Sequence, residues 1–151
     1  MQGMFRGIAW KMSSSRVFLD ANYIIYLRYA EDDKIYEYCV ELLRKLDEYE
    51  SLTNMVVIDE VVWILWKRYR IDKAEIFEFL DRVVEFLTII PLDEEDYKRM
   101  RKLMLNYGLK PSDALHVSTM SKTKTSYIIS EDGEFDSVEW LKRIWLGKQE
   151  L

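Results

Sequence analysis

Short apolar runs alternate with helical patterns along the sequence, and this alternation restricts the chain to few folds. The strand-like runs are VFL (17–19), SLTN (51–54, a strand or a turn), LTIIPL (87–92) and SYIIS (126–130). The segments with apolar residues at helical spacing are 34–50, 72–87 and 93–107. Strands that alternate with helices predict βαβ units, so we expect an α/β fold with a mainly parallel sheet and helices on both faces.

Several residues predict where the helices begin and end. Asp72 is a plausible N-cap, Gly108 closes the helix 93–107, and Pro111 stands at the start of another helix. The segment 55–69 reads MVVIDEVVWILWKRY, which is too apolar for an exposed helix, so we expect it to be largely buried.

The composition, with 49% hydrophobic and 32% charged residues in 151, is that of a globular protein. We expect one domain over residues 16–151, preceded by a loose, partly disordered N-terminal extension over residues 1–15. A formal net charge of −5 argues against a protein that coats nucleic acid through a basic surface. It still allows a nucleic-acid enzyme whose acidic metal site accounts for the charge.

The single cysteine, Cys39, excludes an intramolecular disulfide and a thiolate metal cluster. It occupies an apolar position of a predicted helix, which indicates a buried thiol in a reducing compartment. No stretch reaches the roughly 18 to 20 apolar residues of a membrane span, and no signal-peptide cleavage site is recognisable. We therefore expect a cytoplasmic protein without a membrane association.

Four acidic residues occupy positions that suggest a site. Asp20 and Asp132 each follow a predicted strand, and ligand sites of parallel α/β sheets form beyond the carboxyl ends of the strands. Glu60 lies in the apolar helix, where an isolated charge is costly, and Asp113 lies in the first turn of a helix. Three of them have a structural alternative: Asp20 could cap a helix, Asp113 could interact with the helix dipole, and Asp132 could belong to a turn.

If these four acids converge, their mutual repulsion requires a cation. Carboxylate oxygens alone suit Mg²⁺ or Mn²⁺, whereas Zn²⁺ usually takes His or Cys. The sole histidine, His116, cannot build a zinc site alone, and we expect it to be a packed or supporting residue. A carboxylate-held hard metal, without a phosphate-binding loop or a dinucleotide fingerprint, points to phosphodiester hydrolysis.

The order of four motifs resembles that of the PIN-domain nucleases, and most of all the small VapC-like ribonuclease toxins and their archaeal relatives. The motifs are VFLDAN, a Glu within an apolar helix, PSDALHVSTM and IISEDGEFDSV. The resemblance spans about residues 16–146. It implies a three-layer α/β/α sandwich and Mg²⁺- or Mn²⁺-dependent hydrolysis of single-stranded or structured RNA.

The resemblance also implies roles for individual residues. The catalytic acids of the family match Asp20, Glu60, Asp113 and Asp132. All except Glu60 are implied metal ligands, and Asp136 is an auxiliary or alternative fourth acid and metal ligand. Asn22 and Ser130 match supporting polar residues, and Phe135 matches an aromatic core anchor. The loop 131–136 is more acidic than the motif needs, so its two glutamates either are solvated or enlarge the metal-binding field.

The implied partners are an RNA substrate, a small antitoxin protein that blocks the site, and a second copy in a homodimer. Basic residues such as Lys67, Lys98 and Lys110 are candidates for RNA contacts, with a solvated surface as the alternative for each. Trp63 and Trp66 are expected in the core or an interface. Two other functions stay open: an RNA-processing nuclease without an antitoxin, and a catalytically silent, partner-binding PIN-like module.

Overall fold

Five short strands form one parallel sheet in this computed structural model, which describes residues 15–151. The strands are β1 (Arg16–Leu19), β2 (Glu50–Thr53), β3 (Thr88–Ile89), β4 (Tyr127–Ile129) and β5 (Lys142–Ile144). Their order is β3-β2-β1-β4-β5, and neighbouring strands are parallel throughout. The central strand β1 has a continuous apolar run, Val17–Leu19, that is fully buried, as a strand covered on both faces requires.

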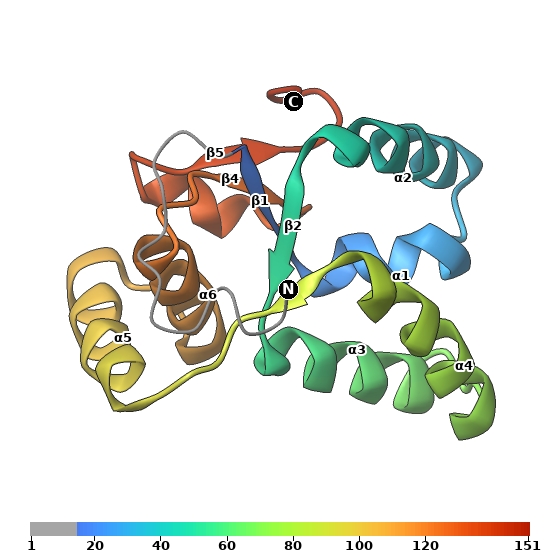
Figure 1. Ribbon diagram of the computed structural model, residues 1–151, viewed down its shortest axis with the longest axis horizontal. Coiled ribbons are helices and arrows are strands. Elements are labelled where there is room, and N and C mark those ends of the chain that lie inside the picture. The colour runs from blue at the N-terminus through green and yellow to red at the C-terminus, as the bar shows by residue number, and fades with distance from the viewer. Residues whose placement is uncertain (1–14) are drawn as a thin grey trace.

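Helices cover both faces of the sheet, which confirms the predicted three-layer α/β/α sandwich. The helices are α1 (Ala21–Tyr29), α2 (Asp33–Lys45), α3 (Met55–Lys67), α4 (Lys73–Val83), α5 (Glu94–Tyr107) and α6 (Pro111–Lys122). Figure 1 shows α5 and α6 on one side of the sheet and α1 and α2 on the other. The described residues also form three 3₁₀ turns, η2 (Leu46–Glu48), η3 (Val84–Phe86) and η4 (Gly133–Ser137).

Side-chain caps set the starts of five helices. The capping residues of α1 to α5 are Asp20, Asp32, Asn54, Asp72 and Asp93. Each side chain accepts a hydrogen bond from a backbone N–H that the first helical turn leaves unpaired. The predicted cap Asp72 is thus confirmed. Gly108 ends α5 in the left-handed conformation with φ 69°, which a glycine adopts without steric cost.

The expectation that the apolar helix 55–69 is largely buried is wrong. In α3, one face is buried through Val57, Val61 and Leu65, whereas Met55 and Trp63 are 56% and 57% exposed. The reason is position: α3 contacts α1, α4 and α6, and no element of residues 15–151 covers its outer side. The helix α3 is therefore buried on one face only, although its sequence is apolar on both.

Two further expectations concern the chain outside the site. Cys39 is fully buried, as predicted, and desolvation raises the pKa of its thiol to about 12. The N-terminal extension predicted over residues 1–15 lies outside the described residues, apart from Ser15. Within residues 15–151, none of the helices has both the length and the apolar content needed to cross a membrane.

Candidate metal centre

The four acids predicted from the sequence lie around the carboxyl edge of the sheet. Asp20 directly follows β1, and Asp132 follows the neighbouring strand β4. The strand β2 lies on one side of β1 and β4 lies on the other, so the strand order reverses between β1 and β4. Glu60 comes from α3 and Asp113 from α6, and these two helices contact each other. Ligand sites of open parallel sheets form in this crevice.

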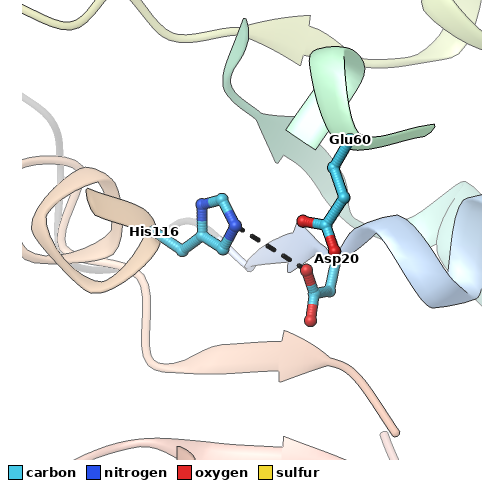
Figure 2. A group of neighbouring side chains, drawn as sticks. All are labelled: Asp20, Glu60 and His116. Atoms are coloured by element: carbon cyan, nitrogen blue, oxygen red, sulfur yellow. Dashed lines mark ion pairs between the residues drawn. The ribbon is translucent and has the colours of Figure 1, made fainter. Parts of the chain in front are cut away.

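Two groups of possible ligands stand at this edge. In the first, Asp20, Glu60 and His116 each place one ligand atom within 4.8 Å of the others. Figure 2 shows Glu60 and His116 reaching Asp20 from different helices. The second group has the same spacing and consists of Asp113, Asp132 and Glu134. Each of the four predicted acids therefore belongs to one of the two groups.

The carboxylate of Asp20 is held in a fixed orientation by hydrogen bonds. Its Oδ1 accepts from the backbone N–H of Ala21 at 2.8 Å, and its Oδ2 accepts from Ser130 Oγ at 2.6 Å and from Asn22 Nδ2 at 3.4 Å. Ser130 Oγ also accepts from the backbone N–H of Asp132 at 3.0 Å. Asn22 and Ser130 thus tie the ends of β1 and β4 together and position both acids.

Asp113 is a buried carboxylate, and one of its two oxygens lacks a hydrogen-bond partner among the described residues. Among the described residues, its Oδ2 has no hydrogen-bond partner, and the ammonium of Lys110 lies 4.0 Å away. Desolvation by burial raises the pKa of Asp113 to about 7; Lys110 opposes the shift, and the negative charges of Asp20 and Asp132 add to it. A cation that reached this carboxylate would supply the missing partner.

Glu60 experiences the same two effects. It is half-buried on α3, and desolvation followed by the charge of Asp20 raises the pKa of its carboxyl. The charge of Asp132 acts in the same direction, so the two ligand groups influence each other electrostatically. Carboxyls that share a site in this way ionise more readily once a divalent cation is bound.

His116 is fully buried, and its tautomer follows from Asn54. The Asn54 Oδ1 accepts from the backbone N–H of Val57, which fixes the amide so that its Nδ2 faces His116 Nδ1 at 3.2 Å. Nδ1 is therefore the acceptor, and the proton resides on Nε2, which lies 3.8 Å from Asp20 Oδ1. Burial lowers the pKa of His116, so the ring is neutral. This ring presents a proton to Asp20 rather than a lone pair to a metal.

Asp136 pairs with Arg143 and belongs to neither group of possible ligands. Arg143 donates to both of its carboxylate oxygens, at 2.8 and 3.0 Å, and these hydrogen bonds hold the pKa of Asp136 below its usual value.

Glu131 is turned toward α1, where it accepts from the hydroxyl of Tyr26 at 2.7 Å. Phe135 is fully buried and anchors the loop, as expected. Of the surplus acids, Glu134 is the one beside Asp113 and Asp132.

Asn54 is the contributor that sequence reasoning missed. It caps α3, and its amide also contacts His116 and the hydroxyl of Thr119 on α6. An asparagine directly before an apolar helix is a recognisable cap signal in the sequence. Its contacts with α6 depend on packing between distant segments, which the signal does not reveal.

The donor set fits a hard divalent cation. It consists of carboxylate oxygens from four separate segments, and one of these carboxylates is buried without a hydrogen-bond partner on one oxygen. Oxygen ligands of this kind are those that Mg²⁺ and Mn²⁺ prefer. The chain is thus a parallel α/β/α domain with a carboxylate cluster at its switch point that could hold such a cation.

Comparison with known proteins identifies the family. Residues 17–141 match the PIN domain family, so the chain belongs to that family. It is 30% identical over 148 residues to Ribonuclease VapC2 of Methanocaldococcus jannaschii, and the match covers 89% of this chain and 96% of the relative.

Two solved structures share the fold. VapC20 of Mycobacterium tuberculosis, a toxin that cleaves the sarcin-ricin loop, has a TM-score of 0.69 at 14% identity, covering 82% of this chain and 95% of its own. A toxin-antitoxin complex from Klebsiella pneumoniae has a TM-score of 0.62 at 16% identity, covering 89% and 99%. At these identities the two structures establish the fold alone.

Proposed function

We propose that this protein is a Mg²⁺- or Mn²⁺-dependent endoribonuclease that hydrolyses RNA phosphodiester bonds at the carboxylate centre. The observation that carries the proposal is the buried Asp113 carboxylate, which lies among other acids with one oxygen unpartnered. Keeping such a group costs folding free energy unless a cation binds there. The 30% identity to a protein named Ribonuclease VapC2 supports RNA as the substrate.

In this proposal the catalytic acids are Asp20, Glu60, Asp113 and Asp132. A bound Mg²⁺ or Mn²⁺ ion would lower the pKa of a water molecule and stabilise negative charge on the phosphate. Asp20, Asp113 and Asp132 would hold it, and we favour Asp132 over Asp136 because Arg143 already pairs with Asp136.

The residues around Asp20 contribute orientation. Ser130 and Asn22 fix its carboxylate from one side, while the Nε2–H of His116 faces it from the other. Such fixed donors reduce the reorganisation that binding a cation and a phosphate would otherwise require. Asn22 and Ser130 are therefore supporting residues of the proposed site.

We further propose that the protein acts as the toxin of a toxin-antitoxin pair, with a small antitoxin protein that blocks the site. The fold shared with VapC20 and with the Klebsiella pneumoniae toxin-antitoxin complex supports this assignment. Induced expression of the wild type should arrest growth, and the Asp113→Asn variant should not. Metal-dependent RNA cleavage without growth arrest would instead favour an RNA-processing nuclease that has no antitoxin.

We also propose a cytoplasmic homodimer whose nuclease unit is residues 16–151. The exposed Met55 and Trp63 of α3 support self-association, and the unpaired thiol of Cys39 suits a reducing compartment. Light scattering after gel filtration tests the dimer directly. A monomer at all concentrations would refute it without affecting the nuclease proposal.

The decisive experiment is cleavage of a panel of single-stranded and structured RNAs by the purified protein. Parallel reactions contain Mg²⁺, Mn²⁺ or EDTA, and the Asp20→Asn and Asp113→Asn variants are run beside the wild type. Cleavage that requires the metal and is lost in both variants supports the proposal. Absence of cleavage by folded, inhibitor-free protein would favour a catalytically silent, partner-binding module.

A further inference from the structure

Lys110 lies beside the carboxylates of the candidate site. It is the N-cap residue of α6, and its ammonium lies 4.0 Å from Asp113 Oδ2. This distance is too long for a hydrogen bond, and the side chain is 56% exposed. The ammonium is therefore near the carboxylates without being fixed to any of them, and a long flexible stem connects it to the backbone.

Four carboxylates act on this single ammonium. The charge of Asp113 makes the largest contribution to raising the pKa of Lys110. Desolvation, the next largest effect, opposes this rise, and the smaller contributions of Asp132, Glu60 and Glu134 add to it. In return, the charge of Lys110 opposes the upward pKa shifts of Glu60 and Asp113. Lys110 is thus electrostatically part of the centre, although it is no metal ligand.

Two other cations on the elements around the centre, Arg143 on β5 and Lys122 at the far end of α6, are committed to structural contacts. Arg143 is held by both oxygens of Asp136 and also donates to the backbone carbonyl of Ser130 at 3.1 Å. Lys122 is held by Asp96 at 2.6 Å and by the carbonyl of Pro91. Neither can move to a substrate without breaking these hydrogen bonds, whereas Lys110 can.

Resting on the proposed nuclease function, we propose that Lys110 contacts the RNA substrate by binding a non-bridging oxygen of a phosphate at the reaction centre. An RNA phosphate that approaches the carboxylates is repelled, and the exposed ammonium of Lys110 beside them offsets this repulsion. The same positive charge repels a metal cation that enters the site. Removal of the charge therefore has opposite effects on the two ligands: metal binding becomes tighter and RNA binding becomes weaker.

The alternative is that Lys110 only forms a local ion pair with Asp113 at the end of the helix. In that case, removing its charge would not weaken RNA binding. The chain offers a matched control for this alternative. Lys98, which the sequence also offered as a candidate for RNA contacts, is instead the solvated surface cation of an (i, i+3) pair: its ammonium donates to Glu95 at 3.1 Å on α5, and its side chain is 50% exposed. The test therefore compares Lys110→Met with Lys98→Met, and Lys110→Arg restores the charge at the site.

The first measurement is calorimetric titration of each protein with Mn²⁺ or Mg²⁺ in the absence of RNA, at a pH well above 7, where the carboxyls whose pKa values Lys110 lowers are ionised in every variant. Lys110→Met should bind the metal about three- to tenfold more tightly than the wild type, because one positive charge no longer repels the ion. Lys110→Arg and Lys98→Met should match the wild type. Unchanged or weaker metal binding by folded Lys110→Met would overturn the proposal; Lys110→Gln serves as a second neutral variant if the Met variant fails to melt cooperatively.

The second measurement is kcat/KM for a labelled single-stranded RNA over a range of NaCl concentrations. Lys110→Met should lower kcat/KM about tenfold or more, as expected for a lost hydrogen bond to a charged group. The slope of log kcat/KM against log salt should flatten by about 0.7, which corresponds to one phosphate contact on a single strand. An unchanged slope would refute the phosphate contact.

The two proposals can fail separately. A wild type that cleaves RNA while Lys110→Met behaves like Lys98→Met refutes the role of Lys110 alone. A wild type that cleaves no RNA refutes the nuclease proposal, and the salt slope is then read from the fluorescence anisotropy of bound RNA. Unchanged anisotropy slopes, or no RNA binding, would refute the role of Lys110 as well.

Discussion

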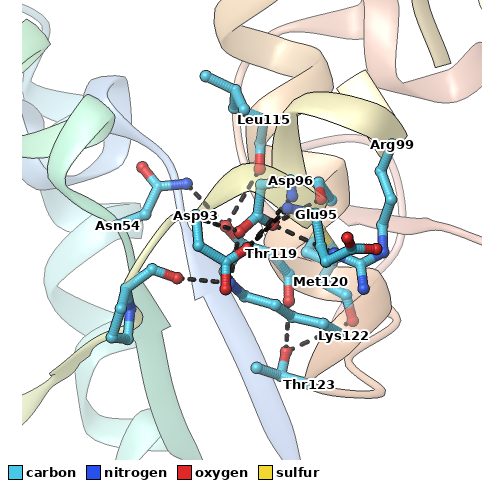
Figure 3. A network of polar contacts seen from close by, with 12 residues as sticks. Asn54, Asp93, Glu95, Asp96, Arg99, Leu115, Thr119, Met120, Lys122 and Thr123 are labelled. Carbon is cyan, nitrogen blue, oxygen red and sulfur yellow. Dashed lines mark hydrogen bonds and ion pairs between the residues drawn. The ribbon is translucent and has the colours of Figure 1, made fainter. Parts of the chain in front are cut away.

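Asp96 and Asp113 are the same residue type at the same local position, yet their surroundings differ. Each is the third residue of its helix, α5 or α6, and each is buried. Asp96 accepts hydrogen bonds from Ser118 Oγ at 2.7 Å, Lys122 Nζ at 2.6 Å and the backbone N–H of Asp93 at 2.9 Å (Figure 3). On Asp113, Oδ2 has no hydrogen-bond partner among the described residues.

The pKa values of the two carboxyls shift in opposite directions. Burial alone would raise the pKa of Asp96, but the hydrogen bonds from Lys122 and Ser118 outweigh it and lower the pKa. For Asp113 burial prevails, and the pKa rises to about 7. Burial of an acid therefore does not by itself indicate function. The combination of burial with a missing partner distinguishes the candidate site from a structural network.

The comparison predicts that Asp96→Ala damages stability and Asp113→Asn does not. Asp96→Ala leaves the half-buried Lys122 without its carboxylate and removes the hydrogen bonds that Asp96 on α5 accepts from Ser118 and Lys122 on α6. We expect a loss of about 3 to 5 kcal/mol in the free energy of unfolding, measured by urea denaturation. RNA cleavage per folded molecule should be unchanged. A loss below about 1 kcal/mol would mean that the Asp96 network is not structural.

Asp113→Asn should have the converse effect. We expect cleavage to fall on the order of 100- to 1,000-fold, because the variant removes a negative charge that binds the cation. In EDTA the variant should be at least as stable as the wild type, since the buried repulsion is gone. A destabilised variant in EDTA would show that Asp113 has a structural role comparable to that of Asp96.

The opposite pKa shifts also predict the pH dependence of stability without metal. Asp113 keeps its proton up to pH about 7 in the folded protein, whereas an exposed aspartate loses it near its usual pKa of 3.8. Its contribution to stability is thus complete below pH about 4 and is lost as the pH rises through about 7, by about 4 kcal/mol for a shift of this size.

Melting in EDTA across this pH range tests the effect. The wild type should lose stability relative to Asp113→Asn between pH about 4 and 7. Asp96 has a lowered pKa, so its contribution is present above its usual pKa and is lost on acidification. Parallel melting curves for the wild type and Asp113→Asn would contradict the assigned shift.

Ser130→Ala should give the smallest effect. The variant removes the hydroxyl that donates to Asp20 and accepts from the backbone N–H of Asp132. We expect cleavage to fall about three- to tenfold, since the acids stay in place with less fixed orientation. Ser137→Ala is the control on the same loop, because Ser137 bonds only the exposed carbonyl of Glu134 among the described residues. Equal losses in both variants would indicate a general effect of the loop.

Much of the fold could be predicted from the sequence because the signals are local. The apolar run Val17–Leu19 marks the central strand, and Asp72 and Gly108 mark helix ends through hydrogen bonds and dihedral angles within a few residues. The sequence could not reveal that α3 has an exposed face, because that depends on which elements cover it. Trp63 and Leu65 are similar in hydrophobicity but opposite in exposure.

The sequence by itself determined the parallel α/β architecture and the acids that follow its strands, since strand ends and residue types are encoded locally. Only the tertiary structure decided which acids are paired. Asp136 pairs with Arg143 and Asp96 pairs with Lys122, whereas one oxygen of Asp113, beside Lys110, has no hydrogen-bond partner among the described residues. The physical reason is that desolvation and charge pairing depend on distances between segments far apart in the chain, and folding alone sets those distances.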